Sequence, residues 1–342
     1  MAMRALQIDR EGSMRVVGID APETTTTDVL IRIRTVGFCG SDLNTYRGLN
    51  PLVSYPRIPG HEIAGVIEHV GSAVPSGLLE AGMDVTVVPY TACGQCPSCR
   101  RGRTNACRDN QTLGVQRDGA LTELVAVPWQ KVLRADGLSA RQLALVEPLS
   151  VGFHAVDRGR VAPEDTVLVI GCGAVGLGAI AGAAHRGARV IAVDVDESKL
   201  ALGRRAGASE TIDTRGRPLH DAVQTLTGGD GADVVIEAVG LPETFVSAVS
   251  EAAFTGRVVY IGYAKAPVSF DTSQFVKKEL DILGSRNATA EDFRAVMAML
   301  RHGGFPVSDA VTRVVGLDDA GEAMREWSER PATITRIHVD LA

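Results

Sequence analysis

Four cysteines in one short stretch of the chain have the spacing of a metal site. Successive gaps of 3, 3 and 8 positions separate Cys93, Cys96, Cys99 and Cys107. Four thiolates can enclose a zinc ion tetrahedrally, and such a closed site leaves no position for a substrate. The chain has an even number of cysteines, but its start resembles no signal peptide, and the C-x-x-C spacing favours metal over disulfides. We therefore predict a structural zinc site that folds a lobe at about residues 90–110.

A second group of residues could hold a metal ion with an open position. Cys39 lies in the motif G-F-C-G-S-D (37–42), and His61 and Glu62 end the motif P-G-H-E (59–62). A lone cysteine or histidine belongs to a core more often than to a metal site. Here both stand beside glycines at the ends of strand-like runs, and an acid follows the histidine. Glu147 lies in the apolar run 145–149, where a carboxylate is costly without a cationic partner. It is a candidate metal-site residue or an ordinary surface position.

A glycine-rich turn between two apolar runs has the pattern of a dinucleotide site. The run 167–170 has the β-branched bias of a buried parallel strand, and an Ala- and Gly-rich, helix-like segment follows the turn. The G-x-G-x-x-G turn consists of Gly171, Cys172, Gly173, Ala174, Val175 and Gly176. The first glycine permits the tight turn, the second lets the backbone approach a pyrophosphate, and the third lets the helix pack closely on the strand. A turn without a ligand is the alternative, which this strand–turn–helix context disfavours.

The acid that ends the second apolar run favours NAD. Asp194 lies 18 residues beyond Gly176, near the spacing of about 20 expected for the acid that binds the adenosine ribose hydroxyls. A carboxylate there would repel a 2′-phosphate, and no arginine directly follows to neutralise one.

The strand-like and helix-like runs of the sequence indicate an α/β protein of two domains. With 342 residues, the chain is too long for one ordinary domain. Strand-like runs at 29–36, 63–70 and 84–88 indicate a small β-rich first domain, and residues 140–158 appear helical on either side of Pro148. Further strand-like runs at 233–238, 257–261 and 280–283 alternate with helix-like segments. Amphipathic helices at about 290–302 and 318–328 precede a closing strand at 333–341, which we expect to return to the first domain.

The small residues that end these later strands predict the rest of the coenzyme groove. Ligands of such sheets bind beyond the carboxyl ends of the strands. We therefore expect Val239, Gly240 and Gly262 to line the groove, and Ser285 and Arg286 to lie near its nicotinamide end.

Composition narrows the class of partner. The net charge of −6 argues against nucleic acid as a primary partner. Arginines 100, 101 and 103 in the cysteine lobe could form a nucleic-acid patch, but a solvated surface or a subunit contact is favoured. No apolar run approaches the ~20 residues of a membrane span, so we expect a soluble, cytoplasmic protein.

Together these motifs resemble the zinc-dependent medium-chain dehydrogenases over essentially the whole chain. The stretch 146–152 is similar to the sorbitol and polyol branch, in which glutamate replaces a cysteine ligand, and the stretches 275–279 and 284–289 resemble bacterial dehydrogenases of L-galactonate or L-gulonate. The resemblance implies a GroES-like catalytic domain (1–153 and 288–342) and a doubly wound, parallel-sheet Rossmann domain (154–287). It also implies a homodimer or homotetramer.

The resemblance further implies two zinc ions per chain and a role for each site residue. A catalytic zinc in a cleft would be held by Cys39, His61 and a carboxylate, either Glu62 or Glu147, and the other acid would bind or replace the zinc-bound water. The expected reaction is hydride transfer from a secondary alcohol of a polyol or sugar acid to NAD⁺, with Ser41 accepting the hydroxyl proton and Arg286 binding the substrate carboxylate. The alternatives are an amino-alcohol dehydrogenase of the L-threonine type and a non-catalytic zinc- and dinucleotide-binding module.

One position departs from the family pattern. Many members carry a histidine five residues after the zinc cysteine, which passes the proton to solvent, whereas this chain has Asn44. An amide does not titrate near pH 7, so we expect a pH–rate profile without the signature of that histidine.

Overall fold

The computed structural model describes residues 2–331 and 334–341. The chain forms two units: unit 1 comprises Met1–Glu147 and Val307–Ala342, and unit 2 comprises Pro148–Pro306. The resemblance implied domain boundaries after residue 153 and before residue 288. These boundaries differ from those of the two units in the placement of two helices. They assign most of α4 (Val146–Arg158) and all of α10 (Ala290–Arg301) to the catalytic domain, whereas nearly all of α4 and all of α10 lie in unit 2.

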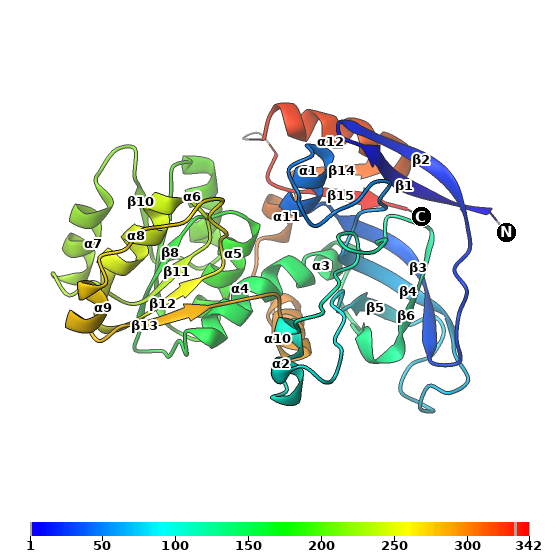
Figure 1. Cartoon of the computed structure of the whole chain (residues 1–342), viewed down its shortest axis with the longest axis horizontal. Helices are drawn as coiled ribbons and strands as arrows, with labels where there is room; N and C mark the ends of the chain where they lie inside the picture. The colour runs from blue at the N-terminus through cyan, green and yellow to red at the C-terminus, as the bar shows by residue number, and fades with distance from the viewer. Residues whose placement is uncertain (1, 332–333, 342) are drawn as a thin grey trace. The chain divides into compact units, whose positions relative to one another are not determined.

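Unit 1 is built on a sheet to which both parts of the chain contribute, with β14 and β15 together at one end beside β3. The order is β14-β15-β3-β4-β5-β7, with β6 also paired to β3, and β1 and β2 form a separate hairpin (Figure 1). The strands are β1 (Ala2–Arg10), β2 (Ser13–Asp20), β3 (Asp28–Gly37), β4 (Glu62–Val70), β5 (Asp84–Val87), β6 (Leu124–Pro128), β7 (Val132–Arg134), β14 (Arg313–Gly316) and β15 (Ile337–Asp340). The helices are α1 (Gly40–Tyr46), α2 (Pro97–Arg100), α3 (Ala140–Ala144), α11 (Val307–Ala310) and α12 (Ala320–Glu329), with 3₁₀ turns η1 (Thr104–Ala106), η2 (Trp129–Lys131) and η3 (Leu317–Asp319).

The alternation along β3 explains how this sheet covers its core. Val29, Ile31 and Ile33 are buried, whereas Arg32 and Arg34 between and beyond them are exposed. Successive side chains of a strand point to opposite faces, so one face of β3 packs into the core of unit 1 and the other carries charge. β15 lies antiparallel to β3, with His338 opposite Gly37, and confirms that the closing strand returns to the first domain. Thr333, the predicted start of that strand, lies outside the described residues.

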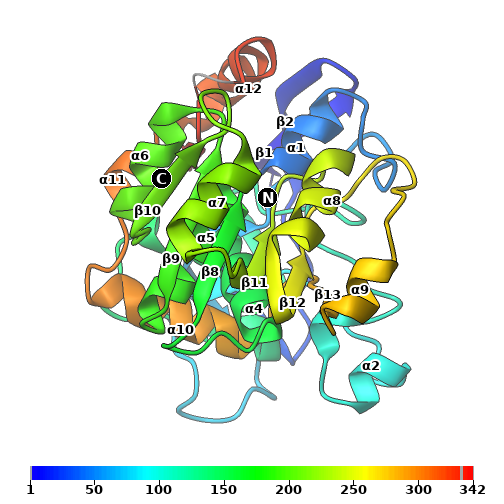
Figure 2. The ribbon, with the colours of Figure 1, turned by 90° about the vertical axis from the view of Figure 1, so that its left-hand side faces the viewer.

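Unit 2 is a six-stranded parallel sheet with helices on both faces. The strand order is β10-β9-β8-β11-β12-β13, and α7 and α8 cover the face turned to the viewer in Figure 2, whereas α5 covers the other. The strands are β8 (Thr166–Ile170), β9 (Arg189–Asp194), β10 (Glu210–Asp213), β11 (Ala232–Glu237), β12 (Ala252–Tyr260) and β13 (Asp281–Gly284). Besides α4 and α10, the helices are α5 (Ala174–His185), α6 (Glu197–Arg205), α7 (Leu219–Thr227), α8 (Pro242–Glu251) and α9 (Ser273–Lys277). The sequence-based prediction of a doubly wound parallel sheet is confirmed, because strand order reverses between β8 and β11.

Residues 140–158 are helical on either side of Pro148, as predicted, and the interruption between the two helices lies at Leu145. Helix α3 ends before Leu145, and α4 runs from Val146 through Pro148 to Arg158. Proline is tolerated in the first turn of a helix, where its missing N–H would have no intrahelical partner. Among the described residues, no helix is both long and apolar enough to span a lipid bilayer.

A buried acid–histidine pair joins α4 to the start of α10 within unit 2. Asp292 Oδ2 accepts hydrogen bonds from the Thr289 backbone N–H at 2.8 Å and the Thr289 hydroxyl at 2.7 Å, and it lies 2.9 Å from His154 Nδ1. Burial alone would raise the pKa of Asp292, but these hydrogen bonds outweigh it and lower that pKa below its ordinary value. The ionised carboxylate is therefore the form that holds the two helices together.

We expect Asp292→Asn to lower the free energy of unfolding at pH 7 by about 1–3 kcal/mol, because hydrogen bonds to a buried charge are lost. Since the folded-state pKa is depressed, this stability is present above the unfolded pKa of about 3.9 and is lost as pH falls through the folded pKa. Urea unfolding should show the full difference at pH 7 and a smaller one at pH 3. Glu291→Gln, at an exposed neighbouring position, is the matched control, and an equal loss there would contradict the interpretation.

Candidate functional site

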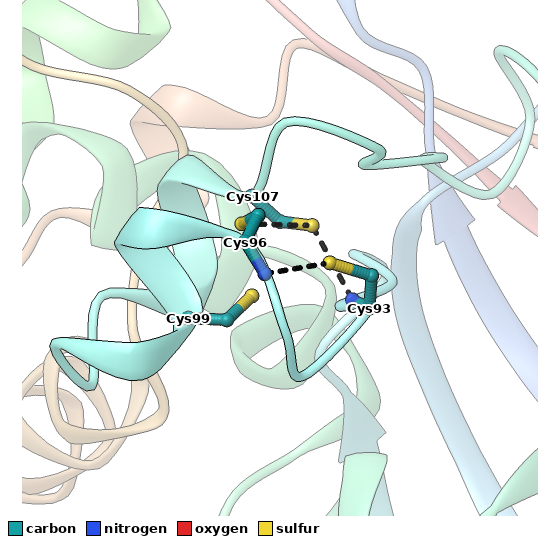
Figure 3. Close-up of side chains that lie close together, drawn as sticks. All are labelled: Cys93, Cys96, Cys99 and Cys107. Atoms are coloured by element: carbon teal, nitrogen blue, oxygen red, sulfur yellow. Dashed lines mark hydrogen bonds between the residues drawn. The ribbon is translucent and has the colours of Figure 1, made fainter.

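The four cysteines of the lobe lie around one point. Their sulfur atoms are within 4.8 Å of one another, and Figure 3 shows the four side chains directed inward from the loop and from α2. Backbone N–H groups of Cys93 and Cys96 donate to the sulfurs of Cys107 and Cys93 at 3.3 Å. Such donors stabilise thiolates, and a hydrogen bond with Ser98 lowers the pKa of Cys96 to about 5. Four ionisable thiols enclosing one position suit a tetrahedral zinc ion.

A second cluster brings together one sulfur, one ring nitrogen and one carboxylate oxygen. The ligand atoms of Cys39, His61 and Glu62 lie within 4.8 Å of one another. Cys39 is the N-cap of α1, and Glu62 is the first residue of β4, which pairs with the end of β3 opposite Gly37. The pairing of β3 and β4 therefore positions all three side chains, since Cys39 follows β3 by two residues and His61 directly precedes β4.

The two carboxylates that the sequence left as alternatives have different partners. Glu62 is fully buried and forms an ion pair through Oε2 with the buried Arg336, while its Oε1 makes no hydrogen bond among the described residues. Glu147 is also buried and accepts a hydrogen bond from the Tyr90 hydroxyl. The compact three-residue cluster contains Glu62 and not Glu147.

The second cluster is surrounded by other buried ionisable side chains. Burial alone would lower the pKa of His61, but the Cys39 sulfur and the Asp42 and Glu147 carboxylates outweigh it and raise that pKa well above its ordinary value. Burial raises the pKa of Asp42 to about 6, although its Oδ2 accepts the Cys39 backbone N–H at 2.8 Å. A concentration of acids and a thiol around a buried imidazole, with carboxylate and ring atoms that lack partners, favours a bound cation.

Helix α1 also carries the residues expected to handle the proton. The Ser41 Oγ is buried and makes no hydrogen bond within the part of the chain that the structure describes, so it is available to a ligand. Asn44, which replaces the family histidine, is exposed.

In unit 2, the glycine turn forms one wall of a cavity of about 490 Å³. A Cβ atom at Gly176 would lie 1.8 Å from the Gly171 carbonyl oxygen, whereas one at Gly173 would meet nothing within 4 Å. Gly176 therefore permits close packing of α5, and Gly173 faces open space, as a pyrophosphate-binding glycine must. Ala174 and Val175 form the first turn of α5 beside it.

Some of the predicted coenzyme residues line this cavity, and others lie behind its wall. Its lining includes Gly171, Gly173, Asp194, Thr214, Val239 and Leu241. Asp194 Oδ2 accepts the Cys172 backbone N–H at 2.8 Å, and its Oδ1 accepts those of Val195 and Asp196, so this acid fixes the turn while facing the cavity. Gly262 packs behind, where a Cβ atom would lie 2.5 Å from the Gly240 nitrogen.

The residues expected at the nicotinamide end follow β13. Ser285 is buried, its backbone N–H donates to Tyr260 O at 2.9 Å, and its hydroxyl makes no hydrogen bond among the described residues. The next residue, Arg286, is exposed.

Comparison with known proteins identifies the family. Residues 25–137 match the alcohol dehydrogenase GroES-like domain, and residues 174–302 match the zinc-binding dehydrogenase domain. The chain is 37% identical over 284 residues to the L-galactonate-5-dehydrogenase of Escherichia coli K12, covering 83% of each chain. This chain belongs to the zinc-dependent alcohol dehydrogenase family.

Two further proteins are similar to this chain. The sorbitol dehydrogenase of Bacillus subtilis is 34% identical over 289 residues, covering 82% of this chain and 81% of that protein. The crystal structure of a dehydrogenase (rspB) from E. coli CFT073, complexed with NADH, superposes with a TM-score of 0.91 at 26% identity and covers 99% of both chains. The expected two-domain architecture, with a GroES-like and a Rossmann part, is confirmed.

Arg336 and Tyr90 are site residues that sequence reasoning did not find. Arg336 pairs with Glu62 across 274 positions, and Tyr90 bonds Glu147 across 57. Neither lies in a motif of its own. The sequence contained one indication of Tyr90. Glu147 lies in an apolar run, where a carboxylate needs a polar partner, but the sequence does not show which residue that partner is.

Proposed function

We propose that this protein oxidises a secondary alcohol of a polyol or sugar acid, with NAD⁺ as hydride acceptor and two zinc ions per chain. The cluster of Cys39, His61 and Glu62 is the observation that carries the proposal. A thiolate, an imidazole and a carboxylate form a three-ligand set with a net charge that nearly neutralises Zn²⁺, and three protein ligands leave the open position of a catalytic site. A purely structural site would need no such position.

Each zinc ion has its own set of residues. Cys93, Cys96, Cys99 and Cys107 would hold the structural ion, and Cys39, His61 and Glu62 the catalytic one. Glu62 is favoured over Glu147 as the third ligand because one of its carboxylate oxygens lies within 4.8 Å of the other two donor atoms, and its Oε1 makes no hydrogen bond among the described residues. When bound, the catalytic zinc lowers the pKa of an alcohol and the nicotinamide supplies the hydride acceptor.

The chain's own residues orient the reactants and move the proton. The Ser41 hydroxyl is buried and makes no hydrogen bond to any residue that the structure describes, and it would accept the hydroxyl proton of the substrate. The Arg336 guanidinium binds Oε2 of Glu62, and Oε1 makes no hydrogen bond among the described residues. Glu147, which accepts a hydrogen bond from the Tyr90 hydroxyl, would be the second acid of the site. Asn44 cannot carry the proton further, so we expect it to leave through water or a ribose hydroxyl.

Residues of unit 2 would bind the dinucleotide. We assign the pyrophosphate to the turn at Gly171, Gly173 and the first turn of α5, and the adenosine ribose to Asp194. The carboxylate of Asp194 faces the cavity, which favours a ribose hydroxyl over a 2′-phosphate and so NAD over NADP. Val239 lines the same cavity, and Gly240, Gly262 and Ser285 would shape the groove toward the nicotinamide.

A substrate screen tests the proposal directly. Purified protein, with zinc content measured, would be assayed for NADH absorbance with polyols, aldonates and L-threonine, before and after treatment with a chelator. Turnover of a polyol or aldonate that the chelator abolishes is the expected result. Turnover of L-threonine would establish the amino-alcohol alternative, and one zinc ion per chain without turnover would establish the non-catalytic module.

We expect Arg286→Ala to raise KM for an acidic substrate by about 10–100-fold while leaving KM for NAD⁺ within about 3-fold, because a guanidinium binds a carboxylate through two hydrogen bonds. L-galactonate and sorbitol, the substrates named for similar proteins, make a pair with and without a carboxylate for steady-state kinetics. Arg294→Ala, at an exposed position on α10, is the control. Equal increases in both KM values would assign Arg286 to the coenzyme instead.

We also propose a cytoplasmic homodimer or homotetramer that uses the edge of the unit 2 sheet. β13 pairs with β12 on one side only, and Ile282 on it is 40% exposed; an open apolar edge is a template for a second strand. Light scattering should give a multiple of 36.1 kDa, and Ile282→Glu should shift it toward one chain. Val314→Glu, equally exposed on β14, should not. A wild-type mass of one chain would contradict the proposal.

A further inference from the structure

Glu237, the last residue of β11, is a fully buried acid that belongs to none of the sequence motifs. Its Oε1 accepts three hydrogen bonds: from the Val239 N–H at 2.8 Å, the Gly240 N–H at 2.7 Å and the Thr244 hydroxyl at 2.8 Å. Two of these donors lie in the turn that follows β11, and the third lies in the first turn of α8. One oxygen atom therefore fixes the whole connection from β11 to α8.

The same residue also holds the turn that follows the neighbouring strand β12. The Glu237 carbonyl oxygen accepts the Ile261 N–H at 2.9 Å and the Gly262 N–H at 3.3 Å. The second carboxylate oxygen, Oε2, is buried, and a Cβ atom at Gly262 would lie 2.5 Å from it. Glu237 thus lies between two turns at the carboxyl ends of adjacent strands, where ligands of such sheets bind.

The connection that Glu237 fixes forms one side of the coenzyme cavity. Ala238, Val239, Leu241, Glu243 and Thr244 all line that cavity, and Glu237 itself does not. Val239 and Leu241 are 44% and 47% exposed, so their side chains stand on a wall that no core packing holds in place. Their positions depend on the backbone hydrogen bonds beneath them.

A charged group suits this position better than a neutral one would. Hydrogen bonds to an ionised acceptor are stronger than those between neutral groups, and a carboxylate near the N-terminus of α8 interacts favourably with the helix dipole. Without the carboxylate, the Val239 and Gly240 N–H groups would be left without their acceptor close to the protein interior.

We propose that Glu237 is a positioning residue for the dinucleotide: its carboxylate preforms the wall of residues 238–244 before the coenzyme binds. This inference rests on the proposed coenzyme site of unit 2 and adds a residue that acts without touching the ligand. Preorganisation of this kind improves affinity because the coenzyme need not order the wall on binding.

Substitution of Glu237, with binding and hydrogen exchange as the measurements, tests the proposal. Glu237→Ala should raise the dissociation constants of both NADH and NADPH, followed by fluorescence titration, by about 10-fold or more. In the protein without nucleotide, the amides of Val239 and Gly240 should exchange at least about 10-fold faster. Glu237→Gln keeps an oxygen acceptor but loses the charge, so both changes should be in the same direction as in Glu237→Ala and smaller.

Glu251→Ala is the matched control. Glu251 is equally an acid of unit 2, 3% exposed, and it lies at the opposite end of α8 with His220 as partner. This variant should lose stability without a change in nucleotide affinity. If it weakens binding as much as Glu237→Ala does, the effect is general destabilisation and the proposal is wrong.

The remaining outcomes are also decisive. Wild-type affinity or unchanged exchange in a folded Glu237→Ala variant would overturn the proposal. Where Glu237→Ala fails to fold, Thr244→Val removes one of the three donors and should weaken binding by about 3-fold; unchanged binding there would equally overturn it. A wild-type protein that binds neither NADH nor NADPH would instead show that the proposed coenzyme function is wrong.

Discussion

Cys39→Ala is expected to lower kcat/KM by at least about 10³-fold and to reduce the zinc content from two ions per chain to one. Of the donors in the open cluster, Cys39 supplies the only sulfur, and a thiolate contributes strongly to zinc affinity. Loss of the Lewis acid removes several kcal/mol of stabilisation of the developing alkoxide. Steady-state kinetics and atomic emission on the same sample measure both effects.

Cys172→Ala is the control for this substitution. Cys172 is also a reduced cysteine in the structure, but it lies in the glycine turn, and burial raises the pKa of its thiol to about 12. Its replacement should leave both zinc ions in place. The assignment of the catalytic metal would be refuted by a Cys39→Ala protein that retains two zinc ions and wild-type turnover.

Cys107→Ser should have its largest effect on stability. Cys107 is fully buried, and its sulfur accepts the Cys93 N–H. Zinc sites of four ligands contribute on the order of 10 kcal/mol to the folding of small domains, and a loss of even half of this corresponds to about 10–20 °C in Tm for a domain of this size. Differential scanning calorimetry measures the shift, and emission spectroscopy should show the loss of the other zinc ion.

Cys39→Ala should therefore mainly lower activity, whereas Cys107→Ser should mainly lower stability. At a temperature where Cys107→Ser is still folded, its remaining zinc should support turnover within about 10-fold of wild type, since a closed site has no position for substrate. Added zinc should not restore its Tm. An unchanged Tm in Cys107→Ser would contradict a structural role for the lobe.

The sequence predicted features whose causes are local. The turn at Gly171–Gly176 was predictable because backbone geometry at each glycine depends on its immediate neighbours, and the four-cysteine lobe because its ligands lie within one loop. The alternation along β3 and the apolar run of β8 likewise predicted strands where the structure has them. The position of the interruption between α3 and α4 was not predictable, because the sequence does not distinguish a proline in the first turn of a helix from one that breaks it.

Features that depend on distant parts of the chain were not predictable in this way. The choice between Glu62 and Glu147 depends on which residues contact each acid. The partner of Glu62 is Arg336, which lies far along the chain in the segment that leads into β15. Glu237 was equally hidden, because its role depends on how the turns after β11 and β12 approach each other. No periodicity or spacing in the sequence records such pairings.

The position of β15 within the unit 1 sheet has a consequence for the order of folding during translation. β15 pairs with β14 on one side and with β3 on the other, yet the ribosome makes it only after all of unit 2. Unit 2 is a continuous segment and can fold as soon as it emerges, as domains of nascent chains do. The sheet that carries Cys39, His61 and Glu62 must wait until residues 336–340 arrive. Until then, residues 35–37 of β3 lack the pairing with β15, and Glu62 lacks its guanidinium partner. Unit 1, whose synthesis begins before that of unit 2, can therefore complete its sheet only after unit 2 has been made.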